Sequence, residues 1–207
     1  MKIEGTEASE VLNGTTGYDE IYGYAGDDTI IGGLGGDTLV GGLGNDLLDG
    51  WVNGNINDSA FNVASYWTAD SAVVVQMQEE DPSKGTATGG AGNDTLINIL
   101  GIIGSNYDDT LTGYLVEGGL GNDMLYGLIP SVAAVESYAV VSYVGAAEGV
   151  VVNLKEGTAT GGEGNDTLIG FSSVSDSKND DSLTGDDNDN RLYGSFGNDH
   201  GKFALTS

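Results

Sequence analysis

The residues best suited to chemistry are acidic side chains that recur at one place in a nine-residue repeat. The complete pattern, GGxGxDx(aliphatic)x, begins at residues 32, 41, 89, 118 and 161. Acidic residues at the sixth position form a series of candidate metal ligands: Glu10, Asp19, Asp28, Asp37, Asp46, Asp94, Asp109, Asp123, Asp166, Asp181 and Asp199. Carboxylate and carbonyl oxygens, without nitrogen or sulfur, favour a hard divalent cation, and flexible glycine loops favour calcium over magnesium.

The same repeat supplies the elements that must position these carboxylates. Units run consecutively over residues 5–49, return at 89–97, 104–112, 118–126 and 161–169, and continue from residue 176. Each unit offers one aliphatic residue, with the alternation of a short strand. We expect these residues to form a buried row: Leu12, Ile21, Ile30, Leu39, Leu47, Leu96, Leu111, Leu125, Leu168, Leu183 and Leu192. One such strand is unstable alone, so the repeats predict a stacked solenoid.

The GGxGxD units resemble the RTX, or hemolysin-type, calcium-binding nonapeptide repeat, over residues 5–49, 85–126 and 157–199. The resemblance implies an all-β, right-handed parallel β-roll in which two nonapeptides make one turn. It implies several calcium ions, each held between loops one turn apart, with Glu10 paired to Asp28, Asp19 to Asp37, and Asp28 to Asp46. It also implies a secreted bacterial protein exported by a type I secretion system, whose signal would lie at the extreme C-terminus, here 203–207.

A longer repeat divides the chain into three predicted segments. Residues 65–78 align with 142–155, and residues 85–113 align without gaps with 157–185. We therefore expect an N-terminal roll over 1–50 and two composite modules, over 51–128 and 129–207. Each module joins a β-rich insert, marked by a valine triplet at 73–75 or 150–152, to further repeats. We expect the inserts to continue the solenoid as wider turns and the C-terminal end to fray.

Three departures from the pattern weaken individual units. Asn190 replaces the acidic residue in unit 185–193, and Gly201 replaces the aliphatic residue in the last unit. Only five residues separate 112 from 118, so a loop is lost there, while Val116 keeps the apolar position.

Composition excludes several classes of protein. The 207 residues carry 32 acidic and 6 basic side chains, a net charge of -26, which disfavours nucleic acid and acidic membrane surfaces as partners. The absence of cysteine excludes disulfides and thiolate sites. We find no apolar segment of the roughly 18 residues that membrane insertion needs, and no secretory signal peptide in the first ten residues.

We predict a calcium-folded structural module that is not an enzyme. A catalytic triad would need His200, the single histidine, which lies in the atypical last unit. The alternative is a calcium-dependent module that binds a polysaccharide or a cell surface through Trp51, Tyr66, Trp67 and Tyr143, although packing is the simpler role for the two matched tyrosines. Ice binding is disfavoured because the third repeat position lacks a row of hydroxyls.

Overall fold

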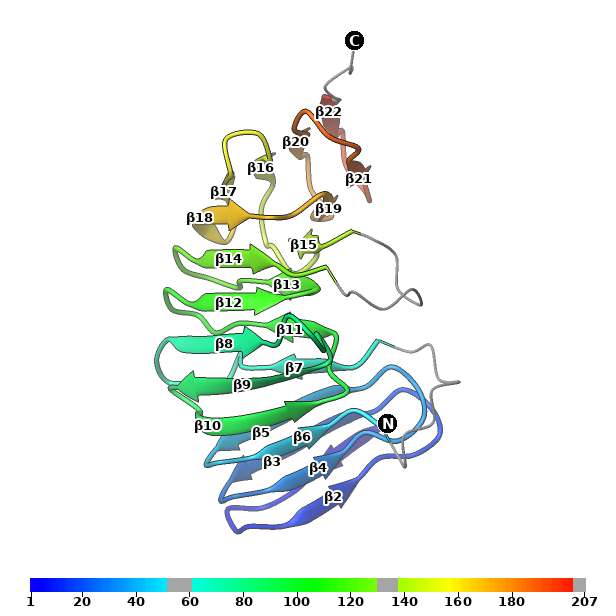
Figure 1. Ribbon diagram of the computed structural model, residues 1–207, viewed down its shortest axis with the longest axis vertical. Helices are drawn as coiled ribbons and strands as arrows, with labels where there is room; N and C mark the ends of the chain where they lie inside the picture. Colours follow the sequence, from blue (N-terminus) through cyan, green and yellow to red (C-terminus); the bar gives the residue numbers. More distant parts are fainter. Residues whose placement is uncertain (52–60, 130–137, 203–207) are drawn as a thin grey trace.

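The chain folds almost entirely into short β-strands joined by tight turns. The structure is a computed structural model that describes residues 1–51, 61–129 and 138–202. Within these ranges there is no helix, and hence none that could span a membrane. The strands stack along one axis and form two sheets that both run the length of the stack. The first strands lie toward one end and the C-terminus lies at the other (Figure 1).

One sheet has nine strands, and all its neighbouring strands are parallel. We call it the nine-stranded sheet. In spatial order it contains β1 (Lys2–Glu4), β3 (Glu20–Ala25), β5 (Thr38–Leu43), β7 (Val63–Ser65), β11 (Gly101–Ile103), β13 (Leu115–Glu117), β15 (Val140–Ser142), β19 (Ser173–Ser175) and β21 (Arg191–Tyr193).

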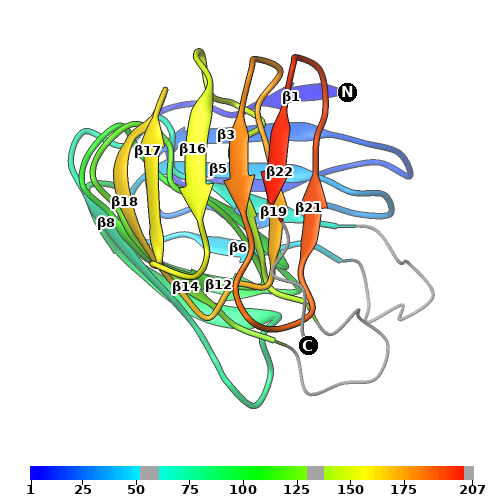
Figure 2. The ribbon, with the colours of Figure 1, turned by 90° about the horizontal axis from the view of Figure 1, so that it is seen from above.

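The other sheet has thirteen strands and mixes parallel and antiparallel pairs. In spatial order this thirteen-stranded sheet contains β2 (Val11–Asn13), β4 (Thr29–Ile31), β6 (Leu47–Asp49), β10 (Gly92–Ile97), β9 (Lys84–Gly89), β8 (Val73–Met77), β12 (Thr110–Gly113), β14 (Met124–Gly127), β18 (Gly164–Ile169), β17 (Thr158–Gly161), β16 (Val150–Asn153), β20 (Ser182–Thr184) and β22 (His200–Lys202). Strands near the two ends of the stack run in clearly different directions, as β3 and β16 show (Figure 2).

The chain alternates between the two sheets, and two nonapeptides complete one coil. The register shows this directly, because Ile3 pairs with Ile21 and Ile21 pairs with Leu39, each eighteen residues further along. The predicted all-β parallel β-roll is therefore confirmed. The shortened stretch between residues 112 and 118 forms the direct step from β12 to β13, and Val116 is fully buried there, as expected.

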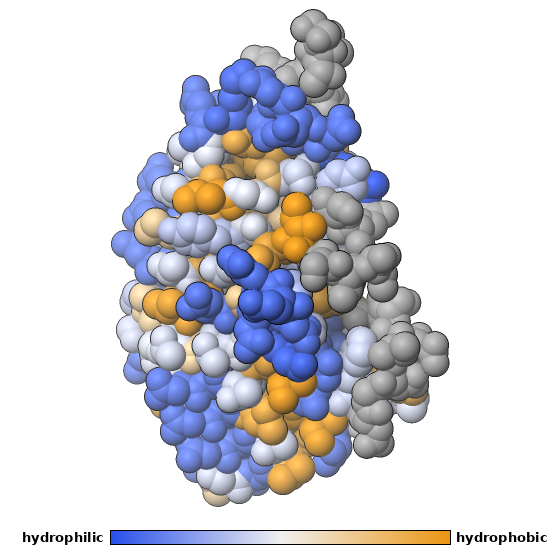
Figure 3. Space-filling model, viewed as in Figure 1, coloured by the Kyte–Doolittle hydropathy of each residue, from blue (hydrophilic) through white to orange (hydrophobic). Residues whose placement is uncertain are grey.

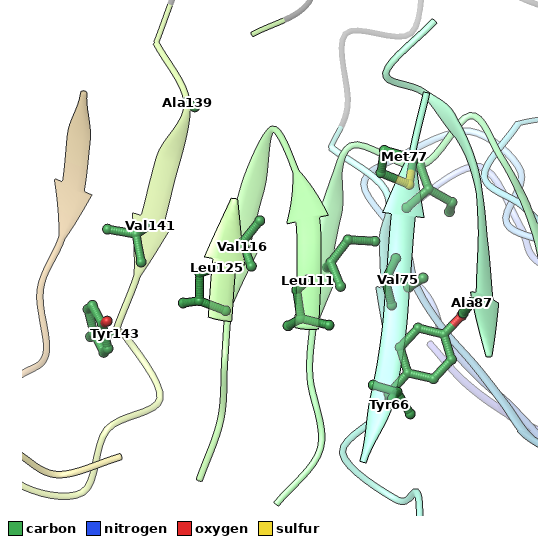
Figure 4. Packing of buried hydrophobic residues seen from close by; sticks show 14 of the residues in the cluster. Tyr66, Val75, Met77, Ala87, Leu111, Val116, Leu125, Ala139, Val141 and Tyr143 are labelled. Atoms are coloured by element: carbon green, nitrogen blue, oxygen red, sulfur yellow. The ribbon is translucent and has the colours of Figure 1, made fainter. Parts of the chain in front are cut away.

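The predicted apolar row forms the core between the sheets, but Leu12 and Leu192, near its two ends, are only partly buried, and one member was assigned to the wrong residue. In unit 41–49 the buried residue is Leu48, while Leu47 is only half-buried. Leu48 holds the eighth position, and adjacent side chains on a strand point to opposite faces. Between the two inserts the row continues with Leu111, Val116 and Leu125, whose side chains belong to the same buried cluster (Figure 4).

The inserts are β-rich, as expected. However, they do not form wider turns of the solenoid; instead, they add strands to the thirteen-stranded sheet. After β7 the chain forms β8, β9 and β10 as an antiparallel meander that runs back toward the N-terminal end, so that β10 pairs with β6 and β8 pairs with β12. The second insert repeats this with β16, β17 and β18. The valine-rich β8 and β16 alternate between buried and exposed side chains, so one apolar face can cover the core.

The surface is mostly hydrophilic, as the acidic composition predicts. On the face shown in Figure 3, apolar side chains occur in small separate groups among polar residues.

Tyr66 and Tyr143 are both buried, which confirms packing as their role. The predicted export-compatible segment 203–207 lies outside the described residues.

Candidate metal centres

The acidic residues at the sixth repeat position stack in ladders along the roll. In each step, one carboxylate oxygen accepts the backbone N–H of the equivalent residue in the preceding coil. Asp28 accepts from Glu10 at 2.8 Å, Asp37 from Asp19 at 2.9 Å, and Asp46 from Asp28 at 2.8 Å. The structure thus brings together the three pairs that the family resemblance implied, and equivalent steps join Asp109 to Asp123 and Asp181 to Asp199.

In the units of Asp28 and Asp109, the second carboxylate oxygen faces a cradle built from glycine backbone. A β-carbon on Gly23 would lie 2.3 Å from Asp28 Oδ2 and 2.4 Å from the Gly41 carbonyl oxygen. A β-carbon on Gly104 would lie 2.5 Å from Asp109 Oδ2 and 2.2 Å from the Gly118 carbonyl oxygen. Glycine at the first repeat position therefore leaves room for a carboxylate of its own unit and a carbonyl of the next coil to converge.

Several of the second carboxylate oxygens in the ladders are buried and have no hydrogen-bond partner. They are the Oδ2 atoms of Asp28, Asp46 and Asp123, all on residues at most 3% exposed. Burial, and then the charges of neighbouring aspartates, raises the pKa of Asp46 to about 6 and that of Asp123 to about 7. A buried carboxylate oxygen without a donor is costly unless a cation compensates it. Hard carboxylate and carbonyl oxygens around a flexible loop fit calcium.

Other ladder carboxylates already have partners within their own unit. In these units the second repeat position carries a hydroxyl residue that donates to the carboxylate. Ser105 N–H donates to Asp109 Oδ2 at 2.5 Å, and Ser177 N–H and Oγ donate to Asp181 Oδ2 at 3.1 and 2.9 Å. Thr15 bonds Asp19 in the same manner. In these units the hydrogen bonds fix the position of the carboxylate, and they stabilise its charge in addition to any bound cation.

The meanders end the ladders and change the surroundings of two predicted ligands. In units 89–97 and 161–169 the glycines form hairpin turns between antiparallel strands instead of loops between sheets. Asp94 and Asp166 still accept the N–H groups of Asp46 and Asp123. However, Asp166 Oδ2 accepts a hydrogen bond from the Tyr143 hydroxyl at 2.9 Å. In this unit the tyrosine hydroxyl therefore satisfies the carboxylate oxygen that lacks a hydrogen-bond partner in Asp28, Asp46 and Asp123.

Tyr66 occupies the matching place beside Asp94 in the first module. Burial and then the charge of Asp94 raise the pKa of Tyr66 well above its usual value. Its hydroxyl makes no hydrogen bond of normal geometry. Burial raises the pKa of Asp94 to about 7.

The last coils contain an acidic cluster that the repeat pattern did not single out. Oxygen atoms of Asp176, Asp181 and Asp199 all lie within 4.8 Å of one another. Asp176 holds the first repeat position, where glycine is usual, and its Oδ2 is buried without a partner. An acidic residue at both the first and sixth positions of one unit was the available sequence signal. Asn190, by contrast, accepts the Asp186 N–H at 2.6 Å, so this unit satisfies its sixth position internally.

A parallel roll that stacks buried carboxylates against glycine carbonyls defines a calcium-binding β-roll. A model of the RTX calcium-binding nonapeptide repeat (4 copies) matches residues 4–39, 31–52, 86–97, 115–128, 158–174 and 173–200, which together make up more than half of the sequence. The chain belongs to this family, and its repeats bind several Ca²⁺ ions. No curated protein matched the sequence at a significant level.

Proposed function

We propose that this chain is a structural module of a secreted bacterial protein that folds when it binds calcium outside the cell. The observation that carries the proposal is the row of buried carboxylate oxygens without partners, at Asp28, Asp46 and Asp123. The proposed ligands are the acidic residues of the sixth repeat position, with glycine carbonyls from the adjoining coil. The bound ion supplies the positive charge that lets these oxygens stay buried and close together.

Electrostatics explains why folding would depend on the ion. Adjacent ladder carboxylates are separated by one strand spacing, about 4.8 Å, and their mutual repulsion opposes stacking. The net charge is -26, and about six to eight divalent ions would neutralise roughly half of it. Metal-binding free energy then becomes folding free energy.

This coupling suits export. Extracellular calcium modules typically have dissociation constants of about 10⁻⁴–10⁻³ M. The cytosolic calcium concentration is far below these values, so the sites would stay empty inside the cell. The chain would stay unfolded inside the cell, pass through a type I secretion system, and fold outside it.

Far-UV circular dichroism tests the proposal. The full chain should give a β spectrum in millimolar calcium and a largely unfolded spectrum after exhaustive chelation, and calcium should restore the first spectrum. An unchanged β spectrum in chelator would refute calcium-driven folding. Magnesium at the same concentration is the control, because its strict octahedral preference suits these loops poorly.

A polysaccharide- or surface-binding role has less support. Tyr66 and Tyr143 are buried and cannot contact a glycan, while Trp67 remains 52% exposed. We infer no catalytic role, because the family's repeat is a structural calcium-binding unit and His200 is an exposed residue whose N–H pairs with the Asp181 carbonyl in the sheet.

A further inference from the structure

The surroundings of the two meanders differ at one matched place on the edge of the roll. Residues 41–49 and 118–126 are equivalent units; the first pairs with the meander β8–β10 and the second with the meander β16–β18. Beside the first meander, the residue before the unit is Val40 and the hairpin-turn residue is Ala91; both are buried. Beside the second meander, the corresponding residues are Glu117 and Glu163. Two carboxylates have therefore replaced two apolar side chains.

These two carboxylates lie close together. A β-carbon on Gly145 would lie 2.4 Å from Glu117 Oε1 and 3.5 Å from Glu163 Oε1. Glu117 is held in place, because Ser142 Oγ donates to its Oε2 at 3.0 Å. Glu163 is only 6% exposed, and its Oε2 has no hydrogen-bond partner.

Both side chains line a pocket of about 320 Å³, whose rim includes Trp67 and Leu120. Burial, followed by the charges of Glu117, Asp166 and Asp123, raises the pKa of Glu163 to about 8. The ion pairs of Lys2, Lys84 and Lys155 are with other acidic residues, Glu4, Asp81 and Asp187. A buried pair of like charges needs a cation or a shared proton.

We propose that Glu117 and Glu163 form an additional divalent-cation site, separate in its ligands from the GGxGxD pattern. At this place a hairpin turn replaces the glycine loop that would otherwise face unit 118–126. Side-chain carboxylates thus supply oxygens where backbone carbonyls of a further loop are missing. Carboxylate ligands select a hard cation, and calcium is the one that the repeats already bind. The pocket leaves room for water molecules to complete the coordination.

Calcium counting on the full chain tests this site. The calcium-folded protein is dialysed to equilibrium, and bound calcium per chain is measured by atomic absorption. Glu163→Ala installs the residue found at the matched position beside the first meander, Ala91, and Glu117→Val installs the residue matched to it, Val40. We expect each variant to bind one ion fewer than the unchanged chain while keeping its β spectrum. Glu148→Ala, which removes an exposed charge from the neighbouring loop, should bind the full number.

A full calcium count in Glu163→Ala would overturn the proposal. If that variant loses its β spectrum, Glu163→Gln, which keeps the size of the side chain, decides: one ion fewer supports the site and an unchanged count refutes it. The site can fail while calcium-driven folding holds, because the circular dichroism test does not depend on these two residues.

Discussion

Replacing Asp28 by Asn would change one buried oxygen in the middle of a ladder and almost nothing else. The amide oxygen can still accept the Glu10 N–H, which the carboxylate accepts at 2.8 Å. The amide nitrogen would take the place of Oδ2, which has no hydrogen-bond partner. Because Oδ2 and the Gly41 carbonyl oxygen both approach the same point above Gly23, the new N–H group faces an acceptor. The substitution therefore removes a cation ligand without leaving a polar group unpaired.

The expected loss is the free energy of binding at one site. For an affinity of about 10⁻⁴–10⁻³ M and calcium near 10 mM, binding stabilises the fold by about 1.4–2.7 kcal/mol per site. Asp28→Asn should lower the free energy of unfolding by about this amount. The difference from the unchanged chain should shrink as calcium falls toward the affinity of the site, because the stabilisation depends on the logarithm of calcium concentration.

Urea unfolding followed by circular dichroism, at several calcium concentrations, measures this loss. Asp27→Asn is the matched control, because Asp27 is the exposed neighbour in the same loop and loses the same charge. A loss in Asp28→Asn that is equal at all calcium concentrations would mean that Asp28 acts through packing alone. An equal effect of both substitutions would reduce the role of Asp28 to net charge. Either result would refute the assignment of Asp28 as a ligand.

Three further predictions follow from the same geometry. Tyr143→Phe should lower the free energy of unfolding in calcium by about 1.5–3 kcal/mol, because it removes a buried bond to the Asp166 carboxylate; a change near zero in urea unfolding would contradict this. Asp176→Asn should weaken calcium binding in the last coils about tenfold, or about 1.4 kcal/mol, seen as later protection of β20 in a calcium titration followed by hydrogen exchange; unchanged protection would contradict it. The pKa values of Asp94 and Asp123, raised from 3.8 to about 7, mean that the calcium-free fold binds more protons than the unfolded chain. Its stability should therefore fall as pH rises from about 4 to 7, so circular dichroism in chelator should show more β structure at the acidic end; a flat profile would contradict this.

Much of the roll could be predicted because its period is written in the sequence. Glycine, aspartate and an aliphatic residue recur nine residues apart, and this period predicts stacked short strands. The eighteen-residue coil and the ladder pairs came from the resemblance to the RTX repeat. The tyrosines were predicted to pack because they occupy matched positions, and burial of Tyr66 and Tyr143 confirms it. The ligand assignments themselves stay predictions.

The meanders could not be predicted because one motif serves two backbone shapes. In the loop of unit 41–49, Gly42 and Gly44 adopt positive φ. In the hairpin turn of unit 89–97, Gly89 and Gly92 do so instead. The letters GGxG allow both, since glycine accepts positive φ at any of these positions. Only the pairing partner, decided by distant strands, separates a loop from a hairpin. The roles of Asp176, Glu117 and Glu163 were missed because they fall outside the repeat's sixth position.

The unequal strand numbers of the two sheets shape the whole column. Nine strands form one wall and thirteen form the other, over the same set of coils. At about 4.8 Å per strand, the four additional strands make one wall roughly 19 Å taller. Because the two sheets differ in height over the same coils, we expect each insert to act as a wedge that bends the roll toward its nine-stranded sheet. Both inserts add strands to the same thirteen-stranded sheet, so we expect the two bends to add instead of cancelling.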